Sequence, residues 1–173
     1  MRLLIVSDIH GSFNNMKEVI VNEKFDKLIL LGDILSGYGT DGYNPNQLAL
    51  LLNLYKDKII CVKGNCDRYD LDLLEFSVDK IFDTLEVDGK TILITHGNYY
   101  NSSNLPDIDF DIFIQGHTHV DRMEKVNNKI YLNPGSISLP RGGDGKTYIV
   151  YENGVFTIKD IDGKSVNSIS VYN

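Results

Sequence analysis

The segment GHTH (116–119) places two imidazole side chains two residues apart, and the chain of 173 residues holds only four histidines. The other two, His10 and His96, stand in the segments SDIHG and THG. Imidazole nitrogens and carboxylate oxygens are common protein ligands of zinc, manganese, iron and nickel. All four histidines could therefore belong to one metal site, provided that the fold brings them together.

Five apolar runs end in residues of this kind. The runs LLIV, KLILL, IICV, TILIT and DIFIQ are typical of buried strands. The residues that follow them are Asp8 and His10, Asp33, Asn65 with Cys66 and Asp67, His96, and His117 with His119. In open α/β sheets, ligand sites form beyond the carboxyl ends of the strands. The five loops therefore predict one shared site.

The candidate ligands are too numerous for one closed tetrahedral site, which takes four. They are Asp8, His10, Asp33, Asn65, His96, His117 and His119. Such a set fits two divalent ions that share a carboxylate, roughly 3.5–4 Å apart, with positions left for water and substrate. Each motif alone could be an ordinary turn or a surface histidine pair. The joint pattern favours a metal site.

The first half of the chain alternates strand and helix patterns. Strand patterns at 3–6, 27–31 and 59–62 are separated by two helix patterns. Ser12 could cap the first helix, and Asn44 followed by proline could cap the second. This alternation predicts parallel strands covered by helices.

The second half contains three strand pairs around tight-turn dipeptides. The dipeptides are Asp88-Gly89, Asn127-Asn128 and Asn153-Gly154. Such dipeptides predict hairpins, so we expect the chain to finish as antiparallel strands. Two packed sheets with helices outside them would combine both halves in one domain, residues 1–173.

Composition limits the class of protein and of partner. The chain is 42% hydrophobic and 24% charged, as ordinary globular proteins are. Its net charge of −7 offers no basic field for long nucleic acids or an anionic membrane. A small phosphate substrate stays compatible with this charge, since bound cations would reverse the local sign. Two cysteines suggest no disulfide framework, and the N-terminal apolar run is too short for a signal peptide. We expect a cytoplasmic protein.

Taken together, the motifs resemble those of the calcineurin-like metallophosphoesterases. They stand in that family's order as SDIHG (7–11), GD (32–33), GNCD (64–67), THG (95–97) and GHTH (116–119). The GNCD motif, the later segment LNPGSISLPRGG (132–143) and the short chain are most similar to small phosphodiesterases of the YfcE type. The resemblance covers essentially the whole chain.

The resemblance implies a fold and a metal centre. The fold would be an α/β class, a four-layer α/β/β/α sandwich of two mixed β-sheets flanked by helices. One ion would take Asp8, His10 and His119, the other would take Asn65, His96 and His117, and Asp33 would bridge them. Manganese is the favoured ion, with zinc, iron and nickel as alternatives. Relatives are often oligomers, so a homo-oligomer is a further expectation.

The expected activity is metal-dependent hydrolysis of small phosphodiesters. Two ions can lower the pKa of a bridging water, so that hydroxide attacks phosphorus. Asn65 and Arg141 could stabilise charge on the other oxygens, although Arg141 could equally be a solvated loop residue and Arg68 has less support. Cys66 stands where many relatives have a histidine that protonates the leaving group. A thiol with a pKa near ~8.5 is a weaker acid at neutral pH.

Several alternatives remain open at the level of sequence. A phosphomonoesterase could use the same centre, and a non-catalytic interaction scaffold could use the same fold. A nuclease is disfavoured by the acidic charge. Tyr38, Tyr43, Tyr99 and Tyr100 could stack on an aryl or nucleoside group at the mouth of the site, or could pack beneath loops.

Overall fold

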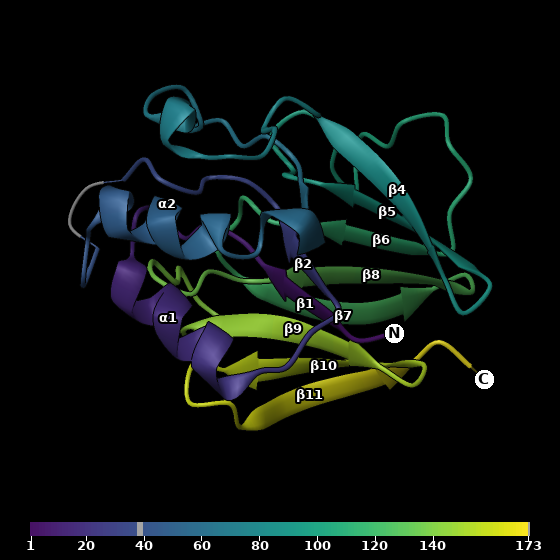
Figure 1. The fold of residues 1–173 in the computed structure, drawn as a ribbon. Coiled ribbons are helices and arrows are strands. Elements are labelled where there is room, and N and C mark those ends of the chain that lie inside the picture. Colours follow the sequence, from purple (N-terminus) through teal and green to yellow (C-terminus); the bar gives the residue numbers. More distant parts are fainter. Residues whose placement is uncertain (38–39, 173) are drawn as a thin grey trace.

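The fold consists of two β-sheets that pack face to face, shown here in a computed structural model (Figure 1). The structure describes residues 1–37 and 40–172. The strands are β1 (Leu3–Val6), β2 (Lys27–Leu30), β3 (Ile59–Cys61), β4 (Phe82–Val87), β5 (Lys90–Thr95), β6 (Ile112–Gln115), β7 (Asp121–Val126), β8 (Lys129–Pro134), β9 (Thr147–Glu152), β10 (Val155–Asp160) and β11 (Ser165–Ser170). Within the described residues, one sheet has the order β11-β10-β9-β1-β2-β3 and the other has the order β4-β5-β6-β8-β7.

Both sheets mix parallel and antiparallel pairs. In the first sheet, β1, β2 and β3 are parallel neighbours, whereas β9, β10 and β11 add antiparallel strands. In the second sheet, β5, β6 and β8 are parallel, and β4 and β7 are antiparallel edge strands. The expectation of a purely antiparallel second half was therefore wrong in part. The connection from β5 to β6, residues 96–111, is long enough to return the chain for parallel pairing.

Strand β1 packs against both neighbouring layers. Leu3 and Ile5 belong to the apolar cluster between the two sheets, together with residues of β5 and β6. Leu4 and Val6 belong to the cluster beneath the helices, together with Met16. Successive side chains of a strand point to opposite faces, so a strand between two apolar layers must be apolar throughout. This explains the unbroken run LLIV.

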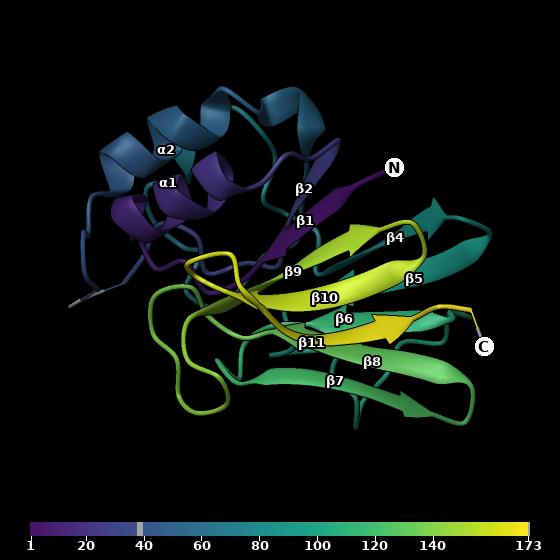
Figure 2. The same ribbon diagram turned by 90° about the horizontal axis from the view of Figure 1, so that it is seen from below.

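The α-helices lie over the outer face of the six-stranded sheet (Figure 2). The helices are α1 (Phe13–Asn22) and α2 (Pro45–Asn53), with short 3-10 helices at Lys56–Lys58 and Leu71–Leu73. The prediction for α2 is confirmed, because Asn44 Oδ1 accepts the Gln47 N–H. Ser12 precedes α1 as predicted, but its hydroxyl donates to the Asp41 carbonyl instead of capping the helix. No helix in the described residues is long and apolar enough to cross a membrane.

The three predicted hairpins are confirmed. Each turn dipeptide joins an antiparallel pair, β4 with β5, β7 with β8, and β9 with β10. All six turn residues have positive φ, between 50° and 78°. Two successive residues of positive φ are what a two-residue type I′ turn requires, and Asn, Asp and Gly adopt that conformation most readily.

The outer face of the five-stranded sheet is covered by the segment 97–111. Phe110 and Ile108 from this segment pack against Leu93, Phe113 and Tyr131. In the described part of the chain, both α-helices lie on the other sheet (Figure 2). Both predicted outer layers are present. The layer over the five-stranded sheet is formed mostly by the segment 97–111, in place of the predicted helices.

Glu23, just after α1, is a buried carboxylate that ties the helix to the sheet. It accepts hydrogen bonds from Arg2 Nη2 at 2.6 Å, Lys159 Nζ at 2.6 Å and Tyr148 Oη at 2.9 Å. Burial alone would raise the pKa of this carboxyl, but the hydrogen bonds hold its pKa below the usual range. The ionised form of Glu23 is therefore part of the folded state.

Replacing Glu23 by glutamine should lower the free energy of unfolding by about 2–3 kcal/mol at neutral pH, because Arg2 and Lys159 lose their anionic partner. The folded pKa of Glu23 lies below the unfolded one. Its contribution is therefore present above the unfolded pKa and is lost as pH falls through the folded pKa. Urea unfolding should show the difference between wild type and variant shrinking in acid.

A matched control is Glu75→Gln, since the Glu75 pair with Lys56 is exposed. Exposed ion pairs contribute little, so this variant should unfold like the wild type. Equal losses in both variants would contradict the role given to Glu23.

Candidate metal centre

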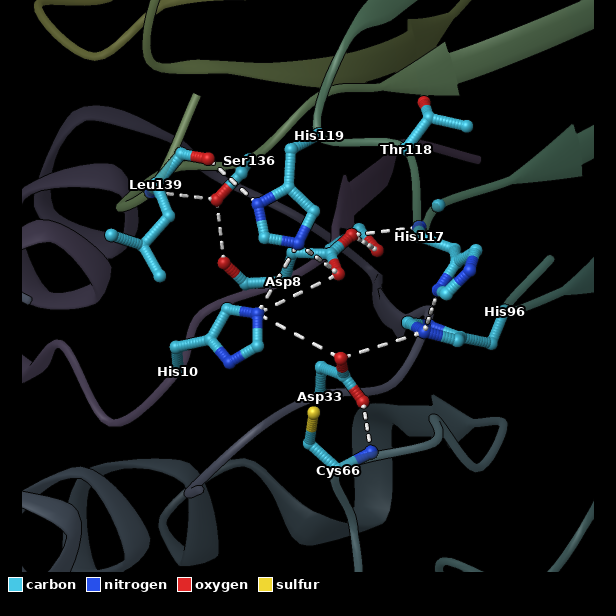
Figure 3. Close-up of polar contacts among 12 residues, drawn as sticks. Asp8, His10, Asp33, Cys66, His96, His117, Thr118, His119, Ser136 and Leu139 are labelled. Atoms are coloured by element: carbon cyan, nitrogen blue, oxygen red, sulfur yellow. Dashed lines mark hydrogen bonds and ion pairs between the residues drawn. The ribbon is translucent and has the colours of Figure 1, made fainter. Parts of the chain in front are cut away.

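The carboxyl ends of five strands meet at one edge of the molecule. β1, β2 and β3 end there in one sheet, and β5 and β6 end there in the other. The loops after these strands bring the predicted ligands together between the sheets (Figure 3). The His117 backbone N–H donates to Asp8 Oδ2 at 2.9 Å, so a hydrogen bond joins the two sheets at this edge.

Asp8, His10 and His119 form the first group of side chains. His119 Nε2 lies 3.1 Å from Asp8 Oδ1, and His10 Nε2 lies 3.8 Å from the same oxygen. The two Nε2 atoms are 3.3 Å apart. All three residues are buried. These atoms are close enough to share one cation.

Asn65, His96 and His117 form the second group. His96 Nε2 lies 3.0 Å from Asn65 Oδ1 and 3.2 Å from His117 Nδ1. These three atoms come from loops of both sheets, after β3, β5 and β6. The second group therefore spans the boundary between the sheets, as the first does.

Asp33 lies between the two groups. Its Oδ2 atom is 3.7 Å from His10 Nε2 and 3.5 Å from His96 Nε2. Its Oδ1 atom accepts the Cys66 backbone N–H at 2.8 Å, which fixes the orientation of the carboxylate. One oxygen of Asp33 thus faces both groups, as a shared carboxylate would. The predicted grouping is present in the structure, and its assignment as a ligand set stays a proposal.

Three of the imidazoles have their Nδ1 atoms engaged with backbone carbonyls. The pairs are His10 with Ser36 at 2.8 Å, His96 with Leu31 at 2.6 Å, and His119 with Leu139 at 2.6 Å. A carbonyl oxygen only accepts, so each Nδ1 carries the proton. This leaves each Nε2 atom directed at the centre, in the arrangement that metal-binding histidines usually show.

Divalent cations fit this donor set. Asp8 Oδ1 is buried and accepts no hydrogen bond from the described residues, although His119 Nε2 lies within ion-pair distance. The neutral imidazoles of His10 and His119 would turn unshared electron pairs toward each other. A buried acceptor surrounded by further acceptors is costly without a cation among them.

The charges at the centre shift the pKa values of its members. Burial alone would raise the pKa of Asp8, but the neighbouring imidazoles of His119 and His96 hold it below the usual range. Burial alone would lower the pKa of His119, but Asp8 raises it. Burial, with His96 nearby, lowers the pKa of His117 and so favours the neutral form that can bind a metal.

Most of the candidate ligands have left-handed backbone conformations. Those with positive φ are Asp8 (53°), His10 (49°), Asp33 (53°), His117 (68°) and His119 (60°). This region is sparsely populated by residues other than glycine, and such strain is typical of functional sites. The surrounding packing therefore holds these loops against a local preference.

Two glycines permit the close approach of the loops. A Cβ atom at Gly64 would overlap Asp33 Oδ1, and one at Gly116 would overlap Ser7 Oγ. Neither residue could be larger without displacing the loop that carries Asp33 or Asp8. The glycines in the GNCD and GHTH motifs are thus required by space.

Asp67 is a site residue to which the sequence assigned no role. It is fully buried and accepts the backbone N–H groups of Asp33, Ile34 and Gly64, each at 2.8 Å. Burial raises the pKa of this carboxyl despite those hydrogen bonds. Asp67 therefore joins the Asp33 loop to the Asn65 loop. In the sequence, the position of Asp67 at the end of the GNCD motif was the one indication that it belongs to the site.

The segment 133–139 supports both sides of the first group. Ser136 Oγ donates to the Asp8 carbonyl at 2.7 Å and accepts the Leu139 N–H at 2.9 Å. The Leu139 carbonyl in turn accepts from His119. Asn133 Nδ2 donates to the Gly116 carbonyl at 2.9 Å. The motif LNPGSISLPRGG therefore holds Asp8 and His119 in place, a role that became visible only in three dimensions.

The remaining candidates lie at the rim. Cys66 Sγ accepts from Asn65 Nδ2 at 3.3 Å, and burial with the charge of Asp33 raises the pKa of this thiol to about 11. Arg141 is exposed, but its charge lies near enough to His119 to oppose the protonation of that imidazole. Arg68 Nε donates to the Asn65 carbonyl at 3.1 Å.

The four tyrosines proposed for the mouth of the site do not form one group. Tyr99 and Tyr100 contact each other edge-on, with centroids 4.8 Å apart, on the loop after His96. Tyr43 lines a cavity together with His10, and Tyr99 and Tyr100 are not among the described residues that line it. Tyr38 lies outside the described residues.

Known proteins resemble this chain in sequence and in fold. The family model described as "Calcineurin-like phosphoesterase superfamily domain" matches residues 1–154. The phosphodiesterase YfcE of Escherichia coli K12 is 32% identical, over 96% of this chain and 95% of its own. The solved structure of YfcE has a TM-score of 0.92 at 30% identity, covering 99% of this chain and all of that one. Vps29 of Cryptosporidium parvum shares the fold, with a TM-score of 0.69 at 20% identity over 98% of this chain and 97% of its own. The predicted fold class is confirmed.

Replacing Ser136 by alanine should weaken Mn²⁺ binding about tenfold, because removing a group that orients metal ligands typically costs 10–100-fold in affinity. The variant removes one of two hydroxyl hydrogen bonds to the Asp8 carbonyl, the other coming from Ser138 Oγ at 3.0 Å, and leaves the Leu139 N–H without its acceptor. Calorimetric titration of the metal-free protein with Mn²⁺ measures the change without requiring turnover.

Ser165→Ala is the control, since Ser165 is exposed at the start of β11. It should bind Mn²⁺ like the wild type. A Ser136→Ala variant that folds and binds Mn²⁺ with unchanged affinity would contradict the supporting role of the segment 133–139.

Proposed function

We propose that this chain, which belongs to the calcineurin-like phosphoesterase superfamily, hydrolyses small phosphodiesters at a centre for two divalent metal ions. The family and the 32% identity to a phosphodiesterase make the chain a phosphoric ester hydrolase. Diesters are the substrates that the relative's name supports. We favour manganese as the ion.

One observation carries the proposal, namely the position of Asp33 Oδ2 between His10 Nε2 and His96 Nε2. A carboxylate oxygen that faces two sets of donors could serve as a ligand to a cation held by either set, and its negative charge would favour both. Two bound divalent ions would lower the pKa of water and withdraw charge from the phosphoryl oxygens. The residues of the chain would hold these ions and orient the ester.

Asn65 would serve both the centre and the substrate. Its Oδ1 atom faces His96, whereas its Nδ2 atom faces Cys66 at the rim. An amide N–H in this place can donate to a phosphoryl oxygen as negative charge develops on it. Arg141 would add a cation on the side of His119.

Cys66 would be a poor proton donor. A thiol is a weak acid at neutral pH, and burial raises the pKa of this one further, so it would supply a proton inefficiently to a leaving oxygen. The reaction would therefore favour ester groups that leave as stable anions, such as phenols.

A scaffold function has less support. Vps29 resembles this chain in fold alone. A scaffold would have no need of five strained loop residues whose donor atoms converge on one buried centre. Such strain is expected where the geometry serves chemistry.

Asp33→Ala should reduce the Mn²⁺-dependent hydrolysis of bis(4-nitrophenyl) phosphate by about three orders of magnitude or more, since both groups lose their shared carboxylate. Release of 4-nitrophenol is followed by absorbance, and 4-nitrophenyl phosphate measured in parallel compares diester with monoester preference. Asp162→Ala removes an exposed carboxylate and should keep full activity. Undiminished turnover by Asp33→Ala would refute the proposed centre.

Cys66→Ala should lower this turnover less than about tenfold, whereas loss of a true general acid typically costs 10²–10⁴-fold. Wild type and variant should also be compared on diphenyl phosphate, because phenolate is a poorer leaving group than 4-nitrophenolate and depends more on a donated proton. Equal, small losses for the nitrophenyl and phenyl esters are expected. A large loss confined to the phenyl ester would show that Cys66 donates the proton.

A further inference from the structure

A cavity of about 660 Å³ opens beside the candidate metal centre. It touches the centre at His10 and Cys66 and extends outward along Tyr43, Arg68, Tyr69 and Leu139. Pockets of 300–1,000 Å³ hold small organic molecules. The cavity is therefore far larger than a phosphoryl group needs, and its outer part has room for another portion of the substrate.

Tyr43 supplies a fixed aromatic surface in this cavity. Its ring packs directly on the backbone of Gly11, where an added Cβ would overlap the ring. The side chain is 42% exposed and lines the cavity. The Cδ2–Cε2 edge of the ring thus rests on protein, and ring surface remains exposed for a ligand.

The backbone around Tyr43 is fastened to the loop that carries His10. The Asn44 N–H donates to the Gly11 carbonyl at 2.8 Å, and Thr40 Oγ1 donates to the His10 carbonyl at 3.0 Å. Tyr43 also forms an isolated β-bridge with Ser12. The ring is therefore held at a fixed place relative to the first group of candidate ligands, so little ordering is required when a ligand binds.

The wall formed by residues 65–70 is likewise connected to the centre. Arg68 Nε donates to the Asn65 carbonyl, so the guanidinium, the one cation among the described residues that line the cavity, is anchored beside a candidate ligand. Tyr69 follows it and is 73% exposed. An exposed tyrosine at the rim of a cavity can close over a planar group, since its ring is apolar and its hydroxyl stays in water.

We propose that this cavity is a subsite for a planar aromatic substituent of the phosphoester, with Tyr43 as its stacking surface. This inference rests on the proposed function and adds the substrate class, namely esters that carry an aryl or nucleoside group. Stacking on an aromatic side chain contributes about 1–3 kcal/mol for a nucleobase and depends little on its identity. The subsite therefore selects planar groups without selecting one base.

The second aromatic pair is a less suitable platform. Tyr99 and Tyr100 contact each other edge-on and are not among the residues that line this cavity. Two described tyrosines, Tyr43 and Tyr69, line the cavity. Tyr43 is the one whose neighbouring backbone is hydrogen-bonded to the loop that carries His10.

The test compares phosphonates, which contain no ester bond to hydrolyse. Methylphosphonate, phenylphosphonate and the 5′-methylenephosphonate analogue of thymidine monophosphate are titrated into the Mn²⁺-loaded protein by calorimetry. The wild type should bind phenylphosphonate about tenfold more tightly than methylphosphonate. The thymidine analogue distinguishes the two sources of aromatic group, since a nucleoside site binds it more tightly than the phenyl compound and an aryl site does the reverse.

The variants assign the preference to a ring. Tyr43→Leu should bring the ratio of the two affinities close to one, and Tyr43→Phe should keep the ratio. Tyr172→Leu removes an exposed tyrosine near the C-terminus and should behave as the wild type. If Tyr43→Leu misfolds and no longer binds methylphosphonate, Tyr69→Ala is the deciding variant. It should reduce the ratio of the phenylphosphonate affinity to the methylphosphonate affinity.

Two other results would overturn the inference. Equal binding of methyl and phenyl compounds by the wild type, or a preference that survives both Tyr43→Leu and Tyr69→Ala, would exclude the aromatic subsite and leave the proposed function intact. Binding of neither phosphonate, together with no hydrolysis of diesters, would refute both.

Discussion

Two buried carboxylates and four imidazoles converge where the sheets meet, and the remaining structure is arranged around that electrostatic constraint. Asp8 and Asp33 are almost fully buried, and none of the described residues donates a hydrogen bond to Asp8 Oδ1. Burying such charges is costly unless cations accompany them. The loops, the glycines of close approach and the backbone hydrogen bonds to the imidazoles all serve to hold these donors at one point.

Much of this arrangement was predictable from the sequence because it follows local rules. Apolar runs followed by Asp, Asn or His predicted where the strands end. The dipeptides Asp88-Gly89 and Asn153-Gly154 predicted hairpin turns, and these turn residues have the positive φ that such turns require. Since parallel strands share a carboxyl edge, five such loops had to lie near one another once the pairing was known. The resemblance of the motifs supplied the pairing of the ligands, which spacing alone left open.

The parts that escaped prediction depend on contacts between distant segments. Ser12 looked like a helix cap, but a carbonyl from residue 41 competes for its hydroxyl. Asp67 and Ser136 bind backbone groups of residues 34 and 128 positions away, respectively, and a sequence does not reveal which backbone group a side chain will reach. The parallel pairing of β5, β6 and β8 was missed because the hairpin turns dominate the local pattern while the crossovers carry no such signal.

The left-handed conformation of the loop residues has an evolutionary consequence. Glycine adopts that conformation readily, and asparagine tolerates it better than most residues do. A change from Asp8 or His117 to glycine would therefore remove a metal-binding side chain while relieving the backbone strain, so activity would be lost before the fold is. Selection that preserves these residues must then act on catalytic activity and not on the stability of the fold. A relative that no longer needs the activity could keep the two-sheet fold and lose the metal-binding residues.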